Sequence, residues 1–187
     1  MRKVLSILFF FIIFLSSFNL VFAQQEIEIK TSSPSAENTC VNYALPYPGL
    51  LPDNPLYFLK TIRDAITRFF ISDPFEKAEY DLLQADKNLN TGYYLFFKNS
   101  GKDKMVSSVI VKAEKSFENA INETVRAKEQ GTDVLELLDK MTISLQKHKE
   151  VLTEIKNGIS ITNIETINNE LKRVQDFKEL VNKIKSK

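Results

Sequence analysis

The sequence predicts an all-α protein, an elongated up-down helical bundle of one short helix and four long amphipathic helices. Three observations lead to this fold class. Apolar residues recur at spacings of three and four over most of the chain after residue 54, which is the period of a helix that buries one face. Glycine is scarce and tryptophan is absent. Short segments rich in Asn, Gly, Asp or Pro separate the periodic stretches.

The short helix is predicted over residues 55–70. Asn54 is a good N-cap, and Pro55 suits the first helical position because no amide donor is needed there. The apolar stripe of this helix comprises Leu56, Leu59, Ile62, Ile66 and Phe69. Such a stripe can lie on a membrane surface or pack against the protein's own bundle. Packing against the bundle is the commoner arrangement, and it is the one we expect.

Four long helices are predicted over about residues 74–98, 102–130, 134–157 and 163–185. Capping-box spacing occurs at Asp73/Glu76, Asp133/Glu136 and Thr162/Glu165. The second helix of the chain has a stripe at Phe75, Ala78, Leu82, Ala85, Leu89, Tyr93 and Phe96, and the fourth at Leu138, Met141, Leu145, His148, Leu152 and Ile155. Short connections between long amphipathic helices make sequence neighbours antiparallel.

The first 23 residues have the three-part layout of a secretory signal peptide. A basic start, Arg2-Lys3, precedes an apolar run, and a Val-Phe-Ala sequence ends at Ala23. If it is not cleaved, the same segment is long enough to span a bilayer as an N-terminal anchor. In both cases the basic end stays inside and the body is translocated. We therefore expect an extracytoplasmic protein, secreted or anchored at the outer face, whose membrane contact is limited to an uncleaved segment 1–23.

A flexible leader is predicted over residues 24–45, and the helical bundle domain over residues 46–187. The domain opens with a proline-rich strap, residues 46–55, in which four prolines restrict the backbone. Tyr47, Leu50 and Leu51 lie between these prolines. A solvated linker has no need of them, so we expect the strap to pack on the body.

The exported chain is close to neutral. Removing Arg2 and Lys3 leaves 23 basic residues against 24 acidic ones. Nucleic-acid binding requires a basic face, so this balance argues against that class of partner. It also gives no electrostatic reason for the whole domain to coat anionic lipid. The single cysteine, Cys40, cannot form an internal disulfide.

Two motifs carry a resemblance to a known family. They are Pro-Gly-Leu-Leu-Pro-Asp-Asn-Pro-Leu-Tyr-Phe-Leu-Lys over residues 48–60 and Asp-Pro-Phe-Glu-Lys-Ala-Glu over residues 73–79. They resemble a widespread prokaryotic domain of unknown function whose members share a PGxLPD(S/N)PxYxLK opening and a DPxxKAE helix start. Asn54 stands where Ser is usual in the family. The resemblance covers the strap and the first two helices, and it implies an exported or membrane-anchored helical protein. It brings no activity, cofactor or catalytic residue.

No catalytic, cofactor-binding or metal-binding residue is assigned from the sequence. A ferritin-type metal site needs paired Glu-x-x-His motifs, whereas the only histidine, His148, follows Leu145 by three residues. The stripes are expected to carry no inward acids, and His148 is interpreted as a partly buried polar residue that pairs with a neighbour or sits at a bundle end. Nucleotide-binding loops and nucleophile motifs do not occur. The chain is therefore predicted to be non-enzymatic and to need no cofactor.

The run Tyr93–Phe97 contains five consecutive large apolar residues, which point in every direction around a helix. One interpretation has neighbouring segments enclose them. The other makes Tyr93, Tyr94, Phe96 and Phe97 an exposed interaction patch.

Together these observations predict a non-enzymatic helical module with an interaction or structural role at the cell envelope, acting through a protein partner that the sequence does not identify. The alternative is a small-molecule or lipid-binding bundle with a cavity lined by Phe side chains, which a large internal void would favour. A third interpretation, an envelope hydrolase, would be favoured by clustered buried acids.

Overall fold

The structure is a computed structural model that describes residues 41–98 and 101–186. This part of the chain contains no strand and five helices. They are α2 (Tyr57–Phe70), α3 (Pro74–Lys98), α4 (Asp103–Glu129), α5 (Leu135–Gly158) and α6 (Ile161–Lys185). The predicted all-α fold, with one short and four long helices, is confirmed. The predicted signal peptide, Cys40 and most of the predicted leader lie outside the described residues.

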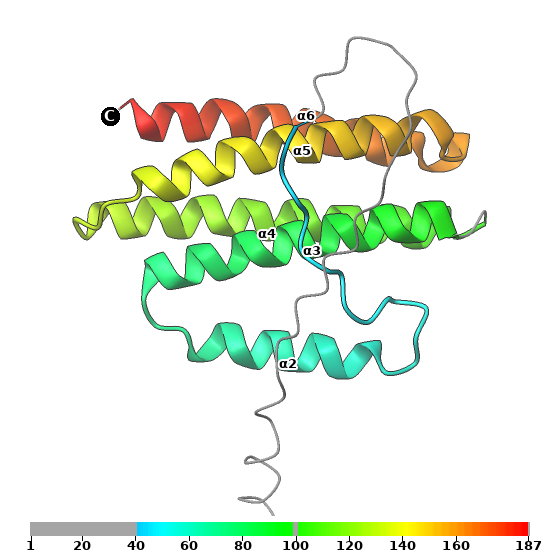
Figure 1. Cartoon of the computed structure of the whole chain (residues 1–187), viewed down its shortest axis with the longest axis horizontal. Coiled ribbons are helices and arrows are strands. Elements are labelled where there is room, and N and C mark those ends of the chain that lie inside the picture. Colours follow the sequence, from blue (N-terminus) through cyan, green and yellow to red (C-terminus); the bar gives the residue numbers. More distant parts are fainter. Residues whose placement is uncertain (1–40, 99–100, 187) are drawn as a thin grey trace, which may run out of the picture. The chain divides into compact units, whose positions relative to one another are not determined.

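Helices α3 to α6 form a four-helix bundle whose members alternate in direction along the chain (Figure 1). Helix α3 packs against α4 and α5, and α6 packs against the same two helices. The consecutive helices α4 and α5 therefore lie on a diagonal of the bundle. As a result, the neighbouring pairs α3/α4 and α5/α6 are antiparallel, whereas α3/α5 and α4/α6 run parallel.

Small residues bring α3 and α4 close together. Ala78 and Ala85 of α3 and Ala113 of α4 are fully buried. A Cβ atom at Gly92 of α3 would lie only 2.6 Å from Cδ1 of Ile110 in α4. A side chain at this position would therefore require the Ile110 side chain to shift.

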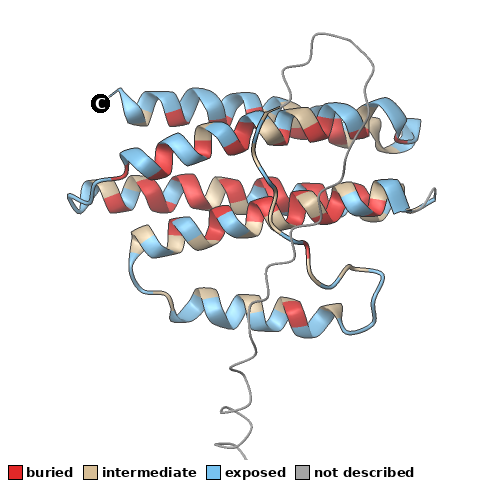
Figure 2. Ribbon diagram, in the orientation of Figure 1, coloured by how far each residue is buried: buried red, intermediate tan, exposed pale blue. Residues whose placement is uncertain are grey.

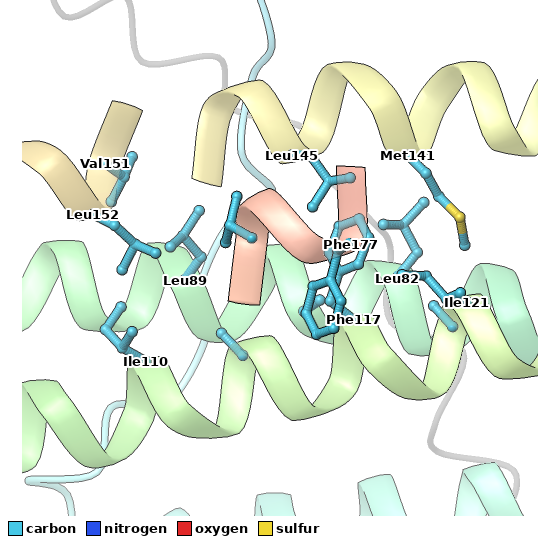
Figure 3. Packing of buried hydrophobic residues seen from close by; sticks show 14 of the residues in the cluster. Leu82, Leu89, Ile110, Phe117, Ile121, Met141, Leu145, Val151, Leu152 and Phe177 are labelled. Atoms are coloured by element: carbon cyan, nitrogen blue, oxygen red, sulfur yellow. The ribbon is translucent and has the colours of Figure 1, made fainter. Parts of the chain in front are cut away.

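The core is built from the predicted stripes of the four long helices. Phe117 of α4 stacks on Phe177 of α6 with ring centroids 5.9 Å apart, and Leu145 of α5 lies beside them (Figure 3). The stripe residues with at most 1% exposure include Ala78, Leu82, Ala85, Leu89, Val106, Ile110, Ala113, Phe117, Ala120, Leu138, Met141, Leu145, Leu152, Ile155, Ile167 and Val181. Their periodicity thus predicted the buried faces of α3 to α6 correctly.

The helix ends agree with the predicted caps in part. The side chain of Asp73 accepts a hydrogen bond from the Glu76 amide at 2.9 Å, as a capping box requires. Asp133 instead accepts from the amide of Leu135 at 3.0 Å, two residues on. The predicted cap at Thr162 is wrong, because α6 already begins at Ile161. Gly131 has φ of 85°, the left-handed geometry that ends a helix.

Residues 41–46 cross the bundle from α5 to α3. The amide of Val41 donates to Glu150 of α5 at 3.1 Å, and Asn90 of α3 donates to the carbonyl of Pro46 at 2.9 Å. Leu45 packs against the core between these contacts. The predicted leader therefore extends too far: its residues from Val41 onward are fixed on the bundle, because their amides and side chains find partners there.

The strap packs on the body through fewer residues than expected. Pro48 is buried, and Leu51 packs against the core. Tyr47 is 78% exposed and Leu50 is 41% exposed, so the expectation that they are covered is wrong. The side chain of Asn54 accepts from the amide of Leu56 at 2.9 Å in a turn that precedes the helix. For this reason α2 begins two residues later than predicted.

Candidate functional site

The apolar stripe of α2 faces away from the bundle. Phe69 is 82% exposed and Phe70 76% exposed, and the other large apolar side chains at this helix are each more than half exposed. We call this surface the α2 apolar face; it comprises Leu56, Phe58, Leu59, Ile62, Ile66, Phe69 and Phe70. The prediction that the stripe packs against the protein's own bundle is wrong. Figure 2 shows the consequence, because most of α2 is exposed.

The bundle instead receives the polar side of α2. Tyr57, Lys60, Thr61, Asp64 and Arg68 recur at spacings of three and four and are the least exposed residues of the helix. Among them Lys60 alone is buried, and its Nζ donates to the carbonyl of Pro48 at 3.2 Å. The helix therefore lies inverted, with its polar side inward.

Arg68 forms the main ion pair between α2 and the bundle. Its Nε and Nη2 donate to the two carboxylate oxygens of Asp81 at 2.7 and 2.9 Å, a bidentate pair. Nη2 also lies 3.4 Å from Glu123 of α4. The Asp81 carboxylate is 4% exposed and raises the pKa of Arg68 above its usual value. Because this buried carboxylate needs a cation, the polar side of α2 is drawn toward the bundle.

Positive charge gathers beside the first half of α2. Lys112 of α4 lies 3.3 Å from the Tyr57 hydroxyl, and Arg63 is exposed at the edge of the α2 apolar face. Burial lowers the pKa of Lys60; the charge of Asp64 acts against this, and the charges of Lys112, Lys87 and Arg63 act with it. We call these four residues, Lys60, Arg63, Lys87 and Lys112, the basic cluster.

The predicted aromatic patch is divided by the bundle. Tyr94 and Phe97 are 51% and 58% exposed, whereas Tyr93 and Phe96 pack partly against the core. A Cβ atom at Gly158 would come within 2.7 Å of Phe96, so the ring lies directly on the end of α5. Both interpretations of the run therefore describe part of it, and its role in an interaction stays a prediction.

A cluster of ionisable side chains lies on the bundle axis, where the sequence predicted no inward acids. Nδ1 of His148 is 2.7 Å from Oε1 of Glu114, and Nε2 is 3.2 Å from Oδ1 of Asp86. Ser144 donates to Asp86 at 2.6 Å, and the Tyr43 hydroxyl donates to it at 2.5 Å. We call these residues the His148 cluster. His148 is fully buried rather than partly so, although it does pair with neighbours as predicted.

The geometry of the His148 cluster is that of a closed ion-pair network. Burial lowers the pKa of His148, but the charges and hydrogen bonds of Glu114 and Asp86 outweigh burial and raise it to about 9. The two carboxylates contact opposite nitrogens of one ring, so they do not converge on a single ion. Across residues 41–98 and 101–186, no group of three or more His, Cys, Asp or Glu residues is placed to hold a metal.

A shallow groove of about 520 Å³ lies between the C-terminal halves of α4 and α6. Its lining combines apolar and charged side chains: Ile121, Asn122, Val125, Lys128, Glu129, Leu180, Lys183 and Ile184. The groove opens to the surface and is not an internal void. None of the helices described by the structure is both long and apolar enough to cross a membrane.

The sequence carried weak signals for the residues that it missed. The sequence identified the apolar stripe of α2. It was predicted to pack against the bundle, whereas in the structure it is exposed. Asp86 and Glu114 each follow an alanine of a core stripe, Ala85 and Ala113, and the small neighbour leaves space for a longer side chain beside it. Nothing in the sequence places Arg68 opposite Asp81.

No curated protein matches the chain, and no solved structure matches it. One family model matches residues 49–186, which span part of the strap and all five described helices. The family is described as a domain of unknown function. Because this match covers most of the sequence, the chain belongs to the DUF5667 family.

Proposed function

We propose that this protein is an extracytoplasmic, non-enzymatic interaction module of the cell envelope that binds its partner through the α2 apolar face. One observation carries the proposal: large apolar side chains stand exposed together on a helix whose polar side is fastened to the body. Covering one such side chain is worth about 1.5–3 kcal/mol. A contiguous surface of this kind is typical of an interaction site.

Two further features support the proposal. The layout of residues 1–23 is that of an export signal, which supports a location outside the cytoplasm. Clustered buried acids, which would favour a hydrolase, occur in the His148 cluster and beside Arg68, where Asp81 and Glu123 are paired with its guanidinium. In the His148 cluster the side chains of His148 and Glu114 are 0% exposed, so a substrate cannot reach them without opening the bundle. A closed network of this kind supports a structural role.

The alternative, a small-molecule or lipid-binding bundle, would use the groove between α4 and α6. Its apolar lining with Lys128 and Lys183 nearby suits an amphiphile that has an acidic head. Titration with a fluorescent fatty acid tests this alternative, and Leu180→Lys should abolish the binding if the groove is the site.

Thiol accessibility in the native envelope tests the main proposal. The chain is expressed with Cys40→Ser, which removes its only cysteine, and a new cysteine is introduced at Phe69. The matched control places the cysteine at Ile161 of α6, which is 87% exposed against 82% for Phe69. A maleimide reagent should label both positions in the purified protein. In intact envelopes we expect only the cysteine at Phe69 to be protected, whereas equal labelling of the two would contradict the proposal.

A further inference from the structure

We propose that the partner of the α2 apolar face is the lipid bilayer, so that α2 is an interfacial helix that holds the bundle against the membrane surface. This inference rests on the proposed function, because it names what covers the same face. It extends the membrane contact beyond residues 1–23 to a folded element of the domain.

The arrangement of side chains around α2 fits the plane of a membrane interface. On a helix of 100° per residue, Ile66 and Leu59 lie at the centre of the outward side, and Ile62, Phe69 and Phe70 flank them. Arg63 lies at the edge of this surface, and Asp64, the only acid in the helix, faces the bundle. An interfacial helix has this pattern, with its apolar side buried about 5–10 Å deep and its polar side away from the acyl chains. Here the bundle occupies the polar side.

The basic cluster supplies charge complementarity to anionic lipid. The exported chain is close to neutral, so positive charge beside α2 is a local concentration and not a property of the whole surface. Lys112 is exposed, and the side chain of Arg63 is 66% exposed although it forms a salt bridge with Asp64 at 2.8 Å. Phosphate headgroups would complement both cations where α2 meets the interface.

The length of chain before the described residues strengthens the inference. Seventeen residues, 24–40, separate the apolar N-terminal segment from Val41. A linker of this length reaches about 55 Å at most and has a typical span of about 20–25 Å if flexible. If residues 1–23 stay in the bilayer, α2 is held within reach of the same surface. Tethering raises the effective concentration to the millimolar range, so even a weakly binding helix would be bound.

Lipid quenching in the full chain tests the inference. The Cys40→Ser chain with Ile66→Cys carries an environment-sensitive fluorophore and is reconstituted in phosphatidylcholine vesicles with about 30% phosphatidylglycerol. Spin labels sit on the upper acyl chain of the lipid. We expect a blue shift and loss of about half of the emission, as for a probe at the depth of an interfacial helix. The matched control probe at Ile161, on α6, should be unaffected.

Two variants distinguish a specific loss of lipid contact from unfolding of the protein. Ile62→Glu puts a charge beside the centre of the α2 apolar face and should abolish the quenching. Its side chain is half exposed, so circular dichroism and the melting temperature should stay close to those of the parent. Arg63→Glu should weaken the quenching several-fold in anionic vesicles and much less in vesicles of phosphatidylcholine alone.

The outcomes distinguish this inference from the proposed function. An Ile66 probe that is no more quenched than the Ile161 probe would overturn the lipid assignment. If Phe69→Cys is nevertheless protected in native envelopes, the proposed function stands with a protein partner. A blue shift that appears without lipid, together with dimerisation in analytical ultracentrifugation, would assign the face to a second copy instead.

Discussion

The His148 cluster predicts that raising the pH from 6.5 to 9 destabilises the bundle. His148 is held between Glu114 of α4 and Asp86 of α3, which raise its pKa from 6.5 to about 9 despite complete burial. Glu170 of α6 lies near Glu114 and adds negative charge on that side. Burial and the charge of Asp86 raise the pKa of Tyr43 well above its usual value, so Tyr43 stays protonated over this range.

The sign of the effect follows from proton linkage. Because the pKa of His148 is higher in the folded state than in the unfolded state, the folded protein binds more protons between the two values. The stabilisation is complete below pH 6.5 and is lost as the pH rises to about 9. At about 1.4 kcal/mol per pH unit, the loss amounts to about 3 kcal/mol. That is a large part of the roughly 5–15 kcal/mol by which domains are stable.

Two measurements check this prediction. His148 is the only histidine, so its imidazole C–H resonances in the NMR spectrum report its pKa without any substitution. Urea unfolding should give a lower free energy at pH 9 than at pH 6.5. Glu118→Gln, which changes a carboxylate outside the cluster, is the control and should keep the same pH dependence. A histidine that titrates near 6.5, or equal free energies at the two pH values, would refute the reasoning.

Three other predictions concern single positions. Tyr43→Phe should lower the unfolding free energy in urea by about 1–3 kcal/mol, because it removes the hydroxyl that donates to buried Asp86; an unchanged midpoint would contradict this. Gly92→Ala should lower the melting temperature, because its Cβ would meet Cδ1 of Ile110. Ile110→Val removes that atom and should make the same glycine substitution less harmful. Intact-mass measurement of the exported protein should find Gln24 as its first residue, whereas a membrane species that retains residues 1–23 would show an uncleaved anchor.

The fold of the long helices was predictable because bundle packing imposes a period on the sequence. Ala78, Leu82 and Ala85 follow one another at spacings of four and three residues and are all fully buried. The same rule predicted α2 as a helix and identified its stripe. Periodicity shows that a helix has an apolar side, but it does not show what covers that side. Which side of α2 faces the bundle depends on the ion pair between Arg68 and Asp81, and this pair forms only in the tertiary structure.

The buried polar groups were harder to predict for a related reason. His148 stands in a core stripe and was visible as an exception there. Asp86 and Glu114 stand one residue outside the stripes, where a charged residue normally faces water. Because α4 and α5 lie diagonally across the bundle, Glu114 and His148 meet on its axis. That arrangement follows from how the four helices are ordered in space, which local patterns do not encode.

The apolar side of α2 faces away from the bundle. Selection for folding and selection for function therefore act on different residues of this sequence. Residues such as Leu82 must satisfy folding, so their substitution removes the protein itself. Phe69, Phe70 and Ile66 add little to the core, and polar replacements there should leave a domain that resists proteolysis as well as the parent does. A library of α2 variants sorted once for protease resistance and once for growth would therefore give two different maps. Positions that tolerate substitution when variants are sorted for protease resistance, but not when they are sorted for growth, would define the surface needed for function. This surface could be mapped before its partner is identified.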